Sequence, residues 1–491
     1  MELDSKISDQ KLSVTKFSIE ELKPLDTESL TDKKPLYPEA ERKLVHKFDW
    51  RLMPMFSTVY FFSSLDRSNI GNAKVAGMDV DLGLSAAQFS TVVSVLYATY
   101  LPFMVPGVWL MKQCKRPRFY LFGMMFSWSI CSLCMMFAKN YGTVIVLRLL
   151  IGLFEGSYFS CIAVITSDYF FPHEMGRRTA YFFASSSLAS AFGGLIGTGI
   201  TEIKSGSLKS WQYIFLIEGL LSIFTGFWLL FFLPDTPEQL LSNEEERAVY
   251  ADRERRRAFF TDQSAFERSE VWEAFKDYKT HFSVVIQFTQ DVCLYGFSTF
   301  LPAILKSGLH YSSLQAQYLS VPVYLLGGLI FLIAAEYSDK KRTRGPVIAF
   351  CNVFGMTGYI LLLVVSNDKV KYFACYLICF SIYTGTGINE SWLASNTAGR
   401  YKRYTAIGIN QTLGNVAGAI SPQVYRKPPD YVLGHAFTLG CLVVSTIASL
   451  TCSWLLRRRN AANQKVMETG VDNRNKKRVR GDDSPEFRFL T

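Results

Sequence analysis

Two charged residues stand side by side in a segment that otherwise has the composition of a membrane-spanning helix. Asp66 and Arg67 occur in the stretch YFFSSLDRSNIG, and a second pair, Arg148 and Glu155, occurs in another apolar segment. Arg148 and Glu155 are seven residues apart, so they share one helical face. A charge at the centre of a bilayer costs about 2.5–3.5 kcal/mol on insertion scales. Such charges persist only where they are paired, hydrated or used.

These residues could bind an anion and carry a proton. Arg67 offers a planar fork of donors that suits a carboxylate. Burial and a nearby arginine act in opposite directions on the protonation of an acid such as Glu155, and that balance suits a proton carrier. A structural role stays open, because Asp66 and Arg67 could cap the end of their helix. Arg148, near the start of its helix, is interpreted as a structural charge that reaches toward the interface.

Long apolar runs must position these side chains. The chain has 491 residues, of which 49% are hydrophobic, and the run WQYIFLIEGLLSIFTGFWLLFFL exceeds the roughly 20 residues that cross a bilayer. Runs without alternation predict helices. We predict twelve spans, near 52–72, 88–111, 118–138, 142–168, 177–201, 211–233, 282–304, 314–337, 346–366, 371–391, 405–425 and 435–456.

The predicted fold class is therefore an all-α membrane protein whose twelve helices form two six-helix halves. The polar stretch between the sixth and seventh spans has alternating charges at helical spacing, so we expect short surface helices in it. The predicted division is a cytosolic disordered tail at 1–49, an N-terminal half at 50–233, a cytosolic linker at 234–281, a C-terminal half at 282–457 and a cytosolic tail at 458–491.

The positive charges indicate orientation. The formal net charge is +10, and Lys and Arg gather in short loops after the second, fourth, eighth, tenth and twelfth spans. That pattern is typical of loops on the cytosolic side, which places both termini in the cytosol, and it does not indicate nucleic-acid binding. We expect a multi-pass protein of the plasma membrane, with an internal membrane as the alternative.

Several kinds of chemistry have no motif in this chain. The sequence lacks GxxxxGK[ST], HExxH and GxSxG, so neither nucleotide-driven transport nor enzyme catalysis is expected. The 10 cysteines lie mostly within apolar runs, where they act as small hydrophobic residues. We predict no metal and no cofactor.

A polar stripe in the second half could line a cavity. Gln287, Gln290, Asp291 and Tyr295 share one face of the seventh span. Tyrosines of the first half could stack on a ring. The predicted substrate contacts besides Arg67 are Tyr97, Tyr158, Gln290, Tyr295 and Asn410. The alternatives are hydrogen bonding between helices for the amides and plain packing for the tyrosines.

Four strings resemble the fungal allantoate permease family of anion:cation symporters, a branch of the major facilitator superfamily. They are LDRSNIGNAKVAGM, RLLIGLFEGSYF, LPDTPEQ and INQTLGNVAGAISPQVY, and the resemblance covers residues 40 to 460 approximately. It implies the twelve-helix major facilitator fold. The family includes carriers of nicotinate, pantothenate, biotin and allantoate. The basic turn in WLMKQCKRPRF departs from the superfamily pattern, because the usual Gly and Asp are absent.

The resemblance also implies roles for the charged residues. Related symporters place an Asp-Arg pair in the first span and a Glu in the fourth, where the carboxylates handle protons and the arginine helps to bind the anion. It thus implies proton coupling at Asp66 and Glu155 and anion binding at Arg67. We predict proton-coupled import of a small organic anion, such as nicotinate or pantothenate, by a monomer with alternating access. An exchanger or facilitator is the alternative, and a nutrient sensor is less favoured.

Overall fold

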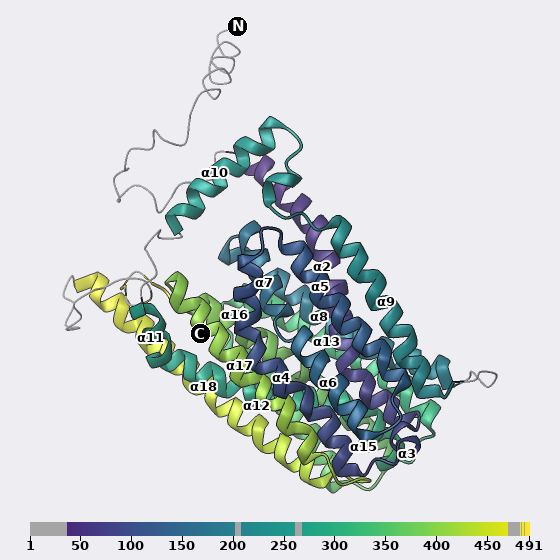
Figure 1. Cartoon of the computed structure of the whole chain (residues 1–491). Helices are drawn as coiled ribbons and strands as arrows, with labels where there is room; N and C mark the ends of the chain where they lie inside the picture. The colour runs from purple at the N-terminus through teal and green to yellow at the C-terminus, as the bar shows by residue number, and fades with distance from the viewer. Residues whose placement is uncertain (1–36, 202–207, 261–267, 470–481, 483, 486) are drawn as a thin grey trace, which may run out of the picture.

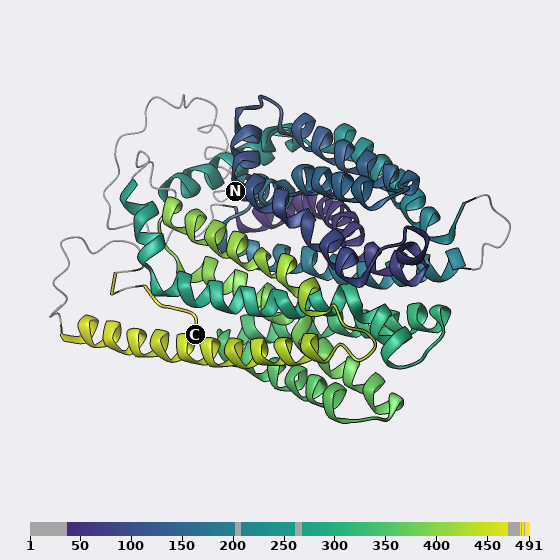
Figure 2. The ribbon, with the colours of Figure 1, turned by 60° about the horizontal axis from the view of Figure 1, so that its bottom comes forward.

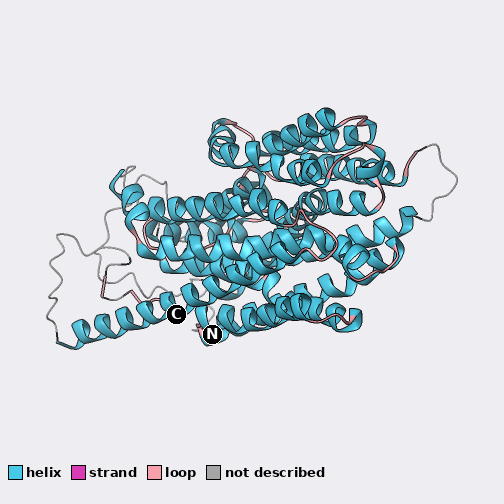
Figure 3. Ribbon diagram, turned by 90° about the horizontal axis from the view of Figure 1, so that it is seen from below, coloured by secondary structure: helices cyan, strands magenta, loops and turns pink. Residues whose placement is uncertain are grey.

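The computed structural model describes residues 37–201, 208–260, 268–469, 482, 484–485 and 487–491. Over these residues the regular structure is helical throughout (Figure 1, Figure 3). Residues 1–36 of the predicted N-terminal tail lie outside the described part. The helical fold follows from the sequence, because long apolar segments without alternation can satisfy their backbone in a membrane only as helices.

Twelve helical segments match the twelve predicted spans. In the N-terminal half they are α2 (Pro38–Val75), α4 (Ala86–Gln113), α5 (Pro117–Cys134), α6 (Tyr141–Glu155) with α7 (Tyr158–Tyr169), α8 (Pro172–Thr201) and α9 (Ser210–Phe232). In the C-terminal half they are α12 (Tyr278–Ala303), α13 (Ser313–Lys341), α14 (Gly345–Val364), α15 (Asp368–Ile382) with α16 (Thr384–Asn396), α17 (Arg400–Val424) and α18 (Val432–Thr469). The fourth and tenth spans, which occupy matching places in the two halves, are each broken into two helices.

Polarity separates the central helices from the outer ones. Seven of the described helical segments are long and apolar enough to cross a membrane, judged by length and composition alone. The other five spans are α2, α8, α12, α15 with α16, and α17. Each of these five contacts the opposite half of the molecule, through the pairs α2–α12, α8–α13, α8–α16 and α4–α17. Polar spans thus lie where protein, rather than lipid, can cover their polar groups.

The two halves form two groups of helices that pack against each other (Figure 2). We call the end of the bundle at which α10 (Glu244–Phe260) and α11 (Arg268–Lys276) lie the linker end. At the opposite end the halves are joined directly. Lys306 Nζ donates to Val75 O at 3.1 Å, Ser94 Oγ donates to Ala419 O at 2.8 Å, and Gln423 Nε2 donates to Ser94 Oγ at 3.0 Å.

A glycine in each half allows this close approach. A Cβ added at Gly71 of α2 would overlap the backbone of Thr299 in α12, and a Cβ added at Gly418 of α17 would overlap the ring of Tyr97 in α4. A residue without a side chain lets two backbones come this close. The two halves are therefore in close contact at the end of the bundle opposite the linker end.

At the linker end, ion pairs consolidate each half separately. In the N-terminal half Arg253 of α10 pairs with Glu41 at 2.7 Å and with Glu174 at 2.8 Å. Burial alone would raise the pKa of Glu174, but the hydrogen bond and charge of Arg253 hold it below its usual value. Glu41 lies within the segment 1–49 that was predicted to be disordered. The helix α2 begins at Pro38 and packs against α10, so residues 38–49 are helical rather than disordered.

The C-terminal half has a matching cluster that includes the end of the chain. Lys279 and Lys402 pair with Asp482 at 2.7 and 2.9 Å and with Asp277 at 2.7 and 3.0 Å. Burial opposes these charges, but the two lysines hold the pKa of Asp277 below its usual value. Likewise, the acids outweigh burial and raise the pKa of Lys402.

The last residues extend this contact. Phe489 is buried, Trp392 Nε1 donates to Leu490 O at 2.9 Å, and Asn460 Nδ2 donates to Phe489 O at 2.8 Å. The predicted tail at 458–491 is thus partly structured: α18 continues to Thr469, and residues 487–491 lie against the linker end of the C-terminal half. The predicted surface helices of the linker are α10 and α11.

Candidate functional site

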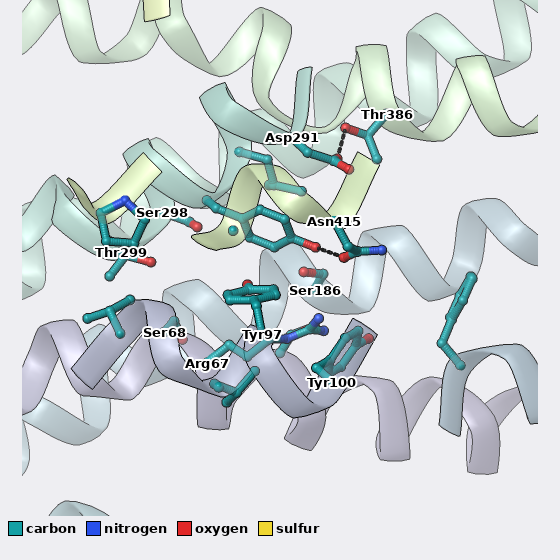
Figure 4. Close-up of a pocket in the computed structure, with 18 of the residues that line it drawn as sticks. Arg67, Ser68, Tyr97, Tyr100, Ser186, Asp291, Ser298, Thr299, Thr386 and Asn415 are labelled. Carbon is teal, nitrogen blue, oxygen red and sulfur yellow. Dashed lines mark hydrogen bonds between the residues drawn. The ribbon is translucent and has the colours of Figure 1, made fainter. Parts of the chain in front are cut away.

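A cavity lies between the two halves, with about 970 Å³ of space that is partly open to solvent. Helices of both halves line it, among them α2, α4 and α8 on one side and α12, α16 and α17 on the other. Polar and aromatic side chains reach into it from both walls (Figure 4).

An ion pair stands at the N-terminal wall of the cavity. Arg67 Nε of α2 lies 3.4 Å from Glu155 Oε1, the last residue of α6. Ser63 Oγ donates to the same carboxylate oxygen at 2.6 Å and accepts from Arg67 Nη2 at 3.2 Å. The Arg67 side chain is 14% exposed and lines the cavity, whereas the Glu155 side chain is 1% exposed and lies behind it. The guanidinium of Arg67 therefore faces the cavity, and the carboxylate of Glu155 lies behind it.

The ion pair leaves bonding capacity unused. At 3.4 Å the contact between Arg67 and Glu155 is longer than a charge-assisted hydrogen bond of about 2.7–2.9 Å. Among the described residues, Glu155 Oε2 has no hydrogen-bond partner. A guanidinium can bind a carboxylate through two parallel hydrogen bonds. Arg67 thus retains donors that a ligand in the cavity could use.

Aromatic rings surround Arg67. The ring of Tyr97 lies 5.5 Å from that of Tyr295 and 5.8 Å from that of Tyr100, between centroids. The guanidinium carbon of Arg67 lies 5.9 Å from the ring centre of Tyr60. Tyr97 belongs to α4 and Tyr295 to α12, so this ring pair joins the two halves across the cavity. Flat surfaces next to a guanidinium suit a planar, negatively charged ligand.

The other wall carries polar groups of the C-terminal half. Tyr295 Oη donates to Asn415 Oδ1 of α17 at 2.5 Å. Asp291 of α12 accepts from Thr386 Oγ1 of α16 at 3.0 Å (Figure 4). It also accepts from Gln287 Nε2 at 3.2 Å. Gln287, Asp291 and Tyr295 all line the cavity, as their helical spacing predicts.

A second group of charges is buried behind the first. Asp66 of α2 is 3% exposed, and its Oδ1 accepts from Ser132 Oγ at 2.6 Å. Glu218 of α9 is fully buried, and its Oε2 accepts from Asn69 Nδ2 at 2.6 Å. The two carboxyl groups interact with each other and with Arg148. We call Asp66, Glu218 and Arg148 the buried charge cluster.

This cluster contains more acids than bases. Asp66 Oδ2, Glu218 Oε1 and Arg148 Nε have no hydrogen-bond partner among the described residues. Two ionised carboxylates beside one guanidinium would leave a net negative charge away from water, which is costly. One proton between the two acids removes that charge. The side chains of Asp66 and Arg67 diverge by about 100° on their helix, so neighbouring residues belong to different clusters.

The structure brings some of the predicted site residues together and separates others. Arg67, Tyr97 and Tyr295 line the cavity, and Glu155 contacts Arg67 from behind. Asp66 does not line the cavity but belongs to the buried charge cluster. The predicted proton roles of Asp66 and Glu155 stay predictions.

Three predicted substrate contacts lie outside the cavity wall. Gln290 Nε2 donates to Asn352 of α14 at 2.8 Å, and its side chain diverges by about 100° from that of its neighbour Asp291. Asn410 Oδ1 accepts from a serine of α12 at 3.0 Å, so it bonds between helices. Tyr158 packs edge-on against Trp128 at 5.0 Å. We therefore propose no substrate contact for Gln290, Asn410 or Tyr158.

The structural role predicted for Arg148 stays a prediction. Its side chain is 2% exposed, so it does not reach toward an interface, and it faces buried acids as a structural charge would. Its position also touches the cavity lining. Glu218 was not predicted from the sequence. The signal was available, because Glu218 is a lone acid in the most apolar predicted span.

The fold and the site define a helical membrane transporter, with two six-helix halves around a central cavity that holds a buried ion pair. The chain belongs to the Major Facilitator Superfamily, whose family model matches residues 56–422. This agrees with the superfamily that the sequence resembles. Proteins of this class are transporters rather than enzymes.

Fungal transporters are among the similar proteins. An uncharacterised transporter of Schizosaccharomyces pombe is 44% identical over 454 residues, covering 92% of this chain and 94% of its own. A high-affinity nicotinic acid transporter of Saccharomyces cerevisiae is 34% identical over 470 residues, covering 93% of this chain and 86% of its own.

Solved structures share the fold. A bacterial homolog of the human lysosomal transporter Spinster has a TM-score of 0.61 at 12% identity, and the match covers 86% of this chain and 97% of that one. The xylose transporter XylE from E. coli has a TM-score of 0.62 at 12% identity, with 81% of this chain and 97% of that one covered. The all-helical, two-half architecture is thus confirmed.

Proposed function

We propose that the protein is a proton-coupled importer of a small organic anion, with a carboxylate vitamin such as nicotinate as the first candidate. The observation that carries the proposal is the loose Arg67–Glu155 pair on the cavity wall, at 3.4 Å. The similarity to a nicotinic acid transporter supports the choice of substrate. The strings that resemble the allantoate permease family support the same class of anion.

The mechanism is an exchange of partners on Arg67. A substrate carboxylate enters the cavity and takes the free donors of the guanidinium, which is better matched by a bidentate ligand than by Glu155. Glu155 then has lost its counter-charge in a dry environment. An ionised acid without a partner is costly there, so Glu155 binds a proton. Substrate and proton thus favour each other, which couples their movement.

Alternating access follows from the two halves. In this structure the halves are closed at the end away from the linker, through α4 with α17 and α2 with α12. Rocking of one half against the other would open that end and close the linker end. We place the linker end in the cytosol, because the basic loops gather there. The membrane is proposed to be the plasma membrane, and the protein is proposed to act as a monomer.

The test is uptake of radiolabelled nicotinate into proteoliposomes that carry a pH gradient. Arg67→Ala should abolish binding, because truncating one partner of a buried charge pair costs about 2–5 kcal/mol, or roughly 30- to 4,000-fold in affinity. Arg426→Ala is the matched control, since that arginine is exposed and bonds only to Gln423 O among the described residues.

Three results would contradict the proposal. If Arg67→Ala transports the anion normally, the guanidinium does not bind it. If a protonophore leaves uptake against the gradient unchanged, the protein is a facilitator or an exchanger rather than a proton symporter. Binding without any flux in the same vesicles would indicate a nutrient sensor.

A further inference from the structure

Asp291 is an acid on the cavity wall without a basic partner. It is 2% exposed, and no lysine or arginine of the described residues forms an ion pair with it. Gln287 Nε2 lies 3.2 and 3.3 Å from its two oxygens, and Thr386 Oγ1 donates to Oδ1 at 3.0 Å. Arg67 lines the same cavity from the opposite half.

The two residues give the cavity a polarity. Arg67 lies on the N-terminal wall and Asp291 on the C-terminal wall (Figure 4). The rings of Tyr97 and Tyr295, whose centroids are 5.5 Å apart, line the same cavity. One wall of the cavity therefore offers a cation to a ligand, the other wall offers an acid, and both walls contribute aromatic rings.

Asp291 must be protonated or must accept a hydrogen bond from a proton that the ligand carries. An ionised carboxylate in a dry wall is costly unless a positive group or several donors face it. Gln287 and Thr386 supply neutral donors, and neither supplies a charge. A ligand group that accepts a hydrogen bond from a protonated acid, or that carries a proton of its own to an ionised one, completes the site.

We propose that Asp291 binds a ring nitrogen of the substrate, so that the cavity selects planar nitrogen heterocycles with a carboxylate at the far end. This rests on the proposed function, because it needs the substrate carboxylate on Arg67. One proton lies between Asp291 and the nitrogen. The proton can reside on Asp291 or on the ring nitrogen. In either case it lowers the net negative charge of Asp291 and the substrate together by one.

The role differs from that of Glu155. Glu155 lies behind Arg67, and it exchanges its partner when a carboxylate arrives. Asp291 lies on the other half and discriminates among carboxylates by their far ends. A substrate held at both ends also joins the two halves through its own atoms. Binding at Arg67 alone would not do this.

The test compares ligands that differ only at the nitrogen. Unlabelled nicotinate and benzoate compete with radiolabelled nicotinate for uptake by wild-type protein in proteoliposomes. A buried polar group left without its partner costs about 1–3 kcal/mol. Nicotinate should therefore compete about 5- to 150-fold better than benzoate. In Asp291→Leu the advantage should fall to near one, with benzoate competing at least as well as before.

One variant serves as a control for the loss of an acid. Asp430→Asn changes an exposed carboxyl group of the same half. It should keep the wild-type ratio between nicotinate and benzoate, which can be measured even where the variant has lower total uptake.

The outcomes separate this inference from the proposed function. If benzoate competes as well as nicotinate in wild-type protein, the inference is wrong whether or not Asp291→Leu folds, and the anion site on Arg67 stands. If Asp291→Leu keeps the wild-type ratio, the nitrogen is bound elsewhere and the inference is again wrong. If wild-type protein shows no saturable uptake of labelled nicotinate, both proposals fail together.

Discussion

Replacing Glu155 by glutamine removes one charge from the site and almost nothing else. The side chain is 1% exposed and Ser63 donates to its Oε1 at 2.6 Å, a bond that an amide oxygen can also accept. Glutamine has nearly the same volume, so packing around α6 should not change. The variant cannot exchange a proton at this position. Arg67 then has no acid to return to once the substrate leaves.

The magnitude follows from linkage. One proton moved with each substrate contributes 1.36 kcal/mol per pH unit, which is a tenfold change in the accumulation ratio. At zero membrane potential, the logarithm of the ratio plotted against the pH difference has a slope equal to the number of protons per substrate. Glu155→Gln should lower that slope by about one. Exchange of labelled for unlabelled substrate needs no net proton movement and should persist.

The assay is nicotinate accumulation in proteoliposomes at a series of pH differences, with the potential clamped by potassium and valinomycin. Counterflow in the same vesicles measures exchange. Glu336→Gln is the matched control, because Glu336 is 68% exposed and its ion pair with Lys340 is on the surface of one helix. A Glu155→Gln protein with normal counterflow and an unchanged slope would refute the partner exchange on Arg67.

Two further predictions concern the other charge clusters. Glu218→Gln should shift the melting temperature in detergent by only a few degrees, because it removes the surplus acid. Arg148→Ala leaves two acids unpaired and should cost about 3–5 kcal/mol; equal shifts for both variants would contradict the one-proton cluster. Asp482→Asn should expose the C-terminal segment to protease at pH 7.5. In the wild type, protection should be lost as pH falls through the lowered pKa of Asp277, or rises through the raised pKa of Lys402, and should hold between them. If protease cleaves the C-terminal segment of the wild type as fast as that of Asp482→Asn at pH 7.5, the prediction is wrong.

Much of the fold could be predicted from the sequence, because hydropathy acts locally. All twelve spans were found, including the five polar ones that hydropathy alone does not identify. The breaks in the fourth and tenth spans were not found, since no proline marks either position. Nor was the docking of residues 487–491, because their contacts, such as that between Trp392 and Leu490, join segments far apart in the chain.

Part of the candidate site could be predicted, because a charged residue is conspicuous in an apolar segment. The insertion cost singled out Arg67 and Glu155, and the structure brings them together. The amides were harder. Gln290 and Asp291 are neighbours in sequence, yet one bonds toward α14 and the other lines the cavity. Which side of a polar helix faces a cavity depends on the helices around it, and a single sequence does not give that arrangement.

The same geometry suggests why two charge clusters stand so close together. The helix α2 contributes Arg67 to the cavity and Asp66 to the buried charge cluster, and α6 contributes Glu155 to the first and Arg148 to the second. Each helix therefore contributes one charge of each sign to the two clusters. When a substrate draws Arg67 away from Glu155, any movement of α2 relative to α6 also changes how Asp66 meets Arg148. Asp66 and Glu218 can then gain or lose the proton that they share, although neither lines the cavity. Substrate binding in the cavity and the net charge of the buried charge cluster are therefore expected to change in the same step.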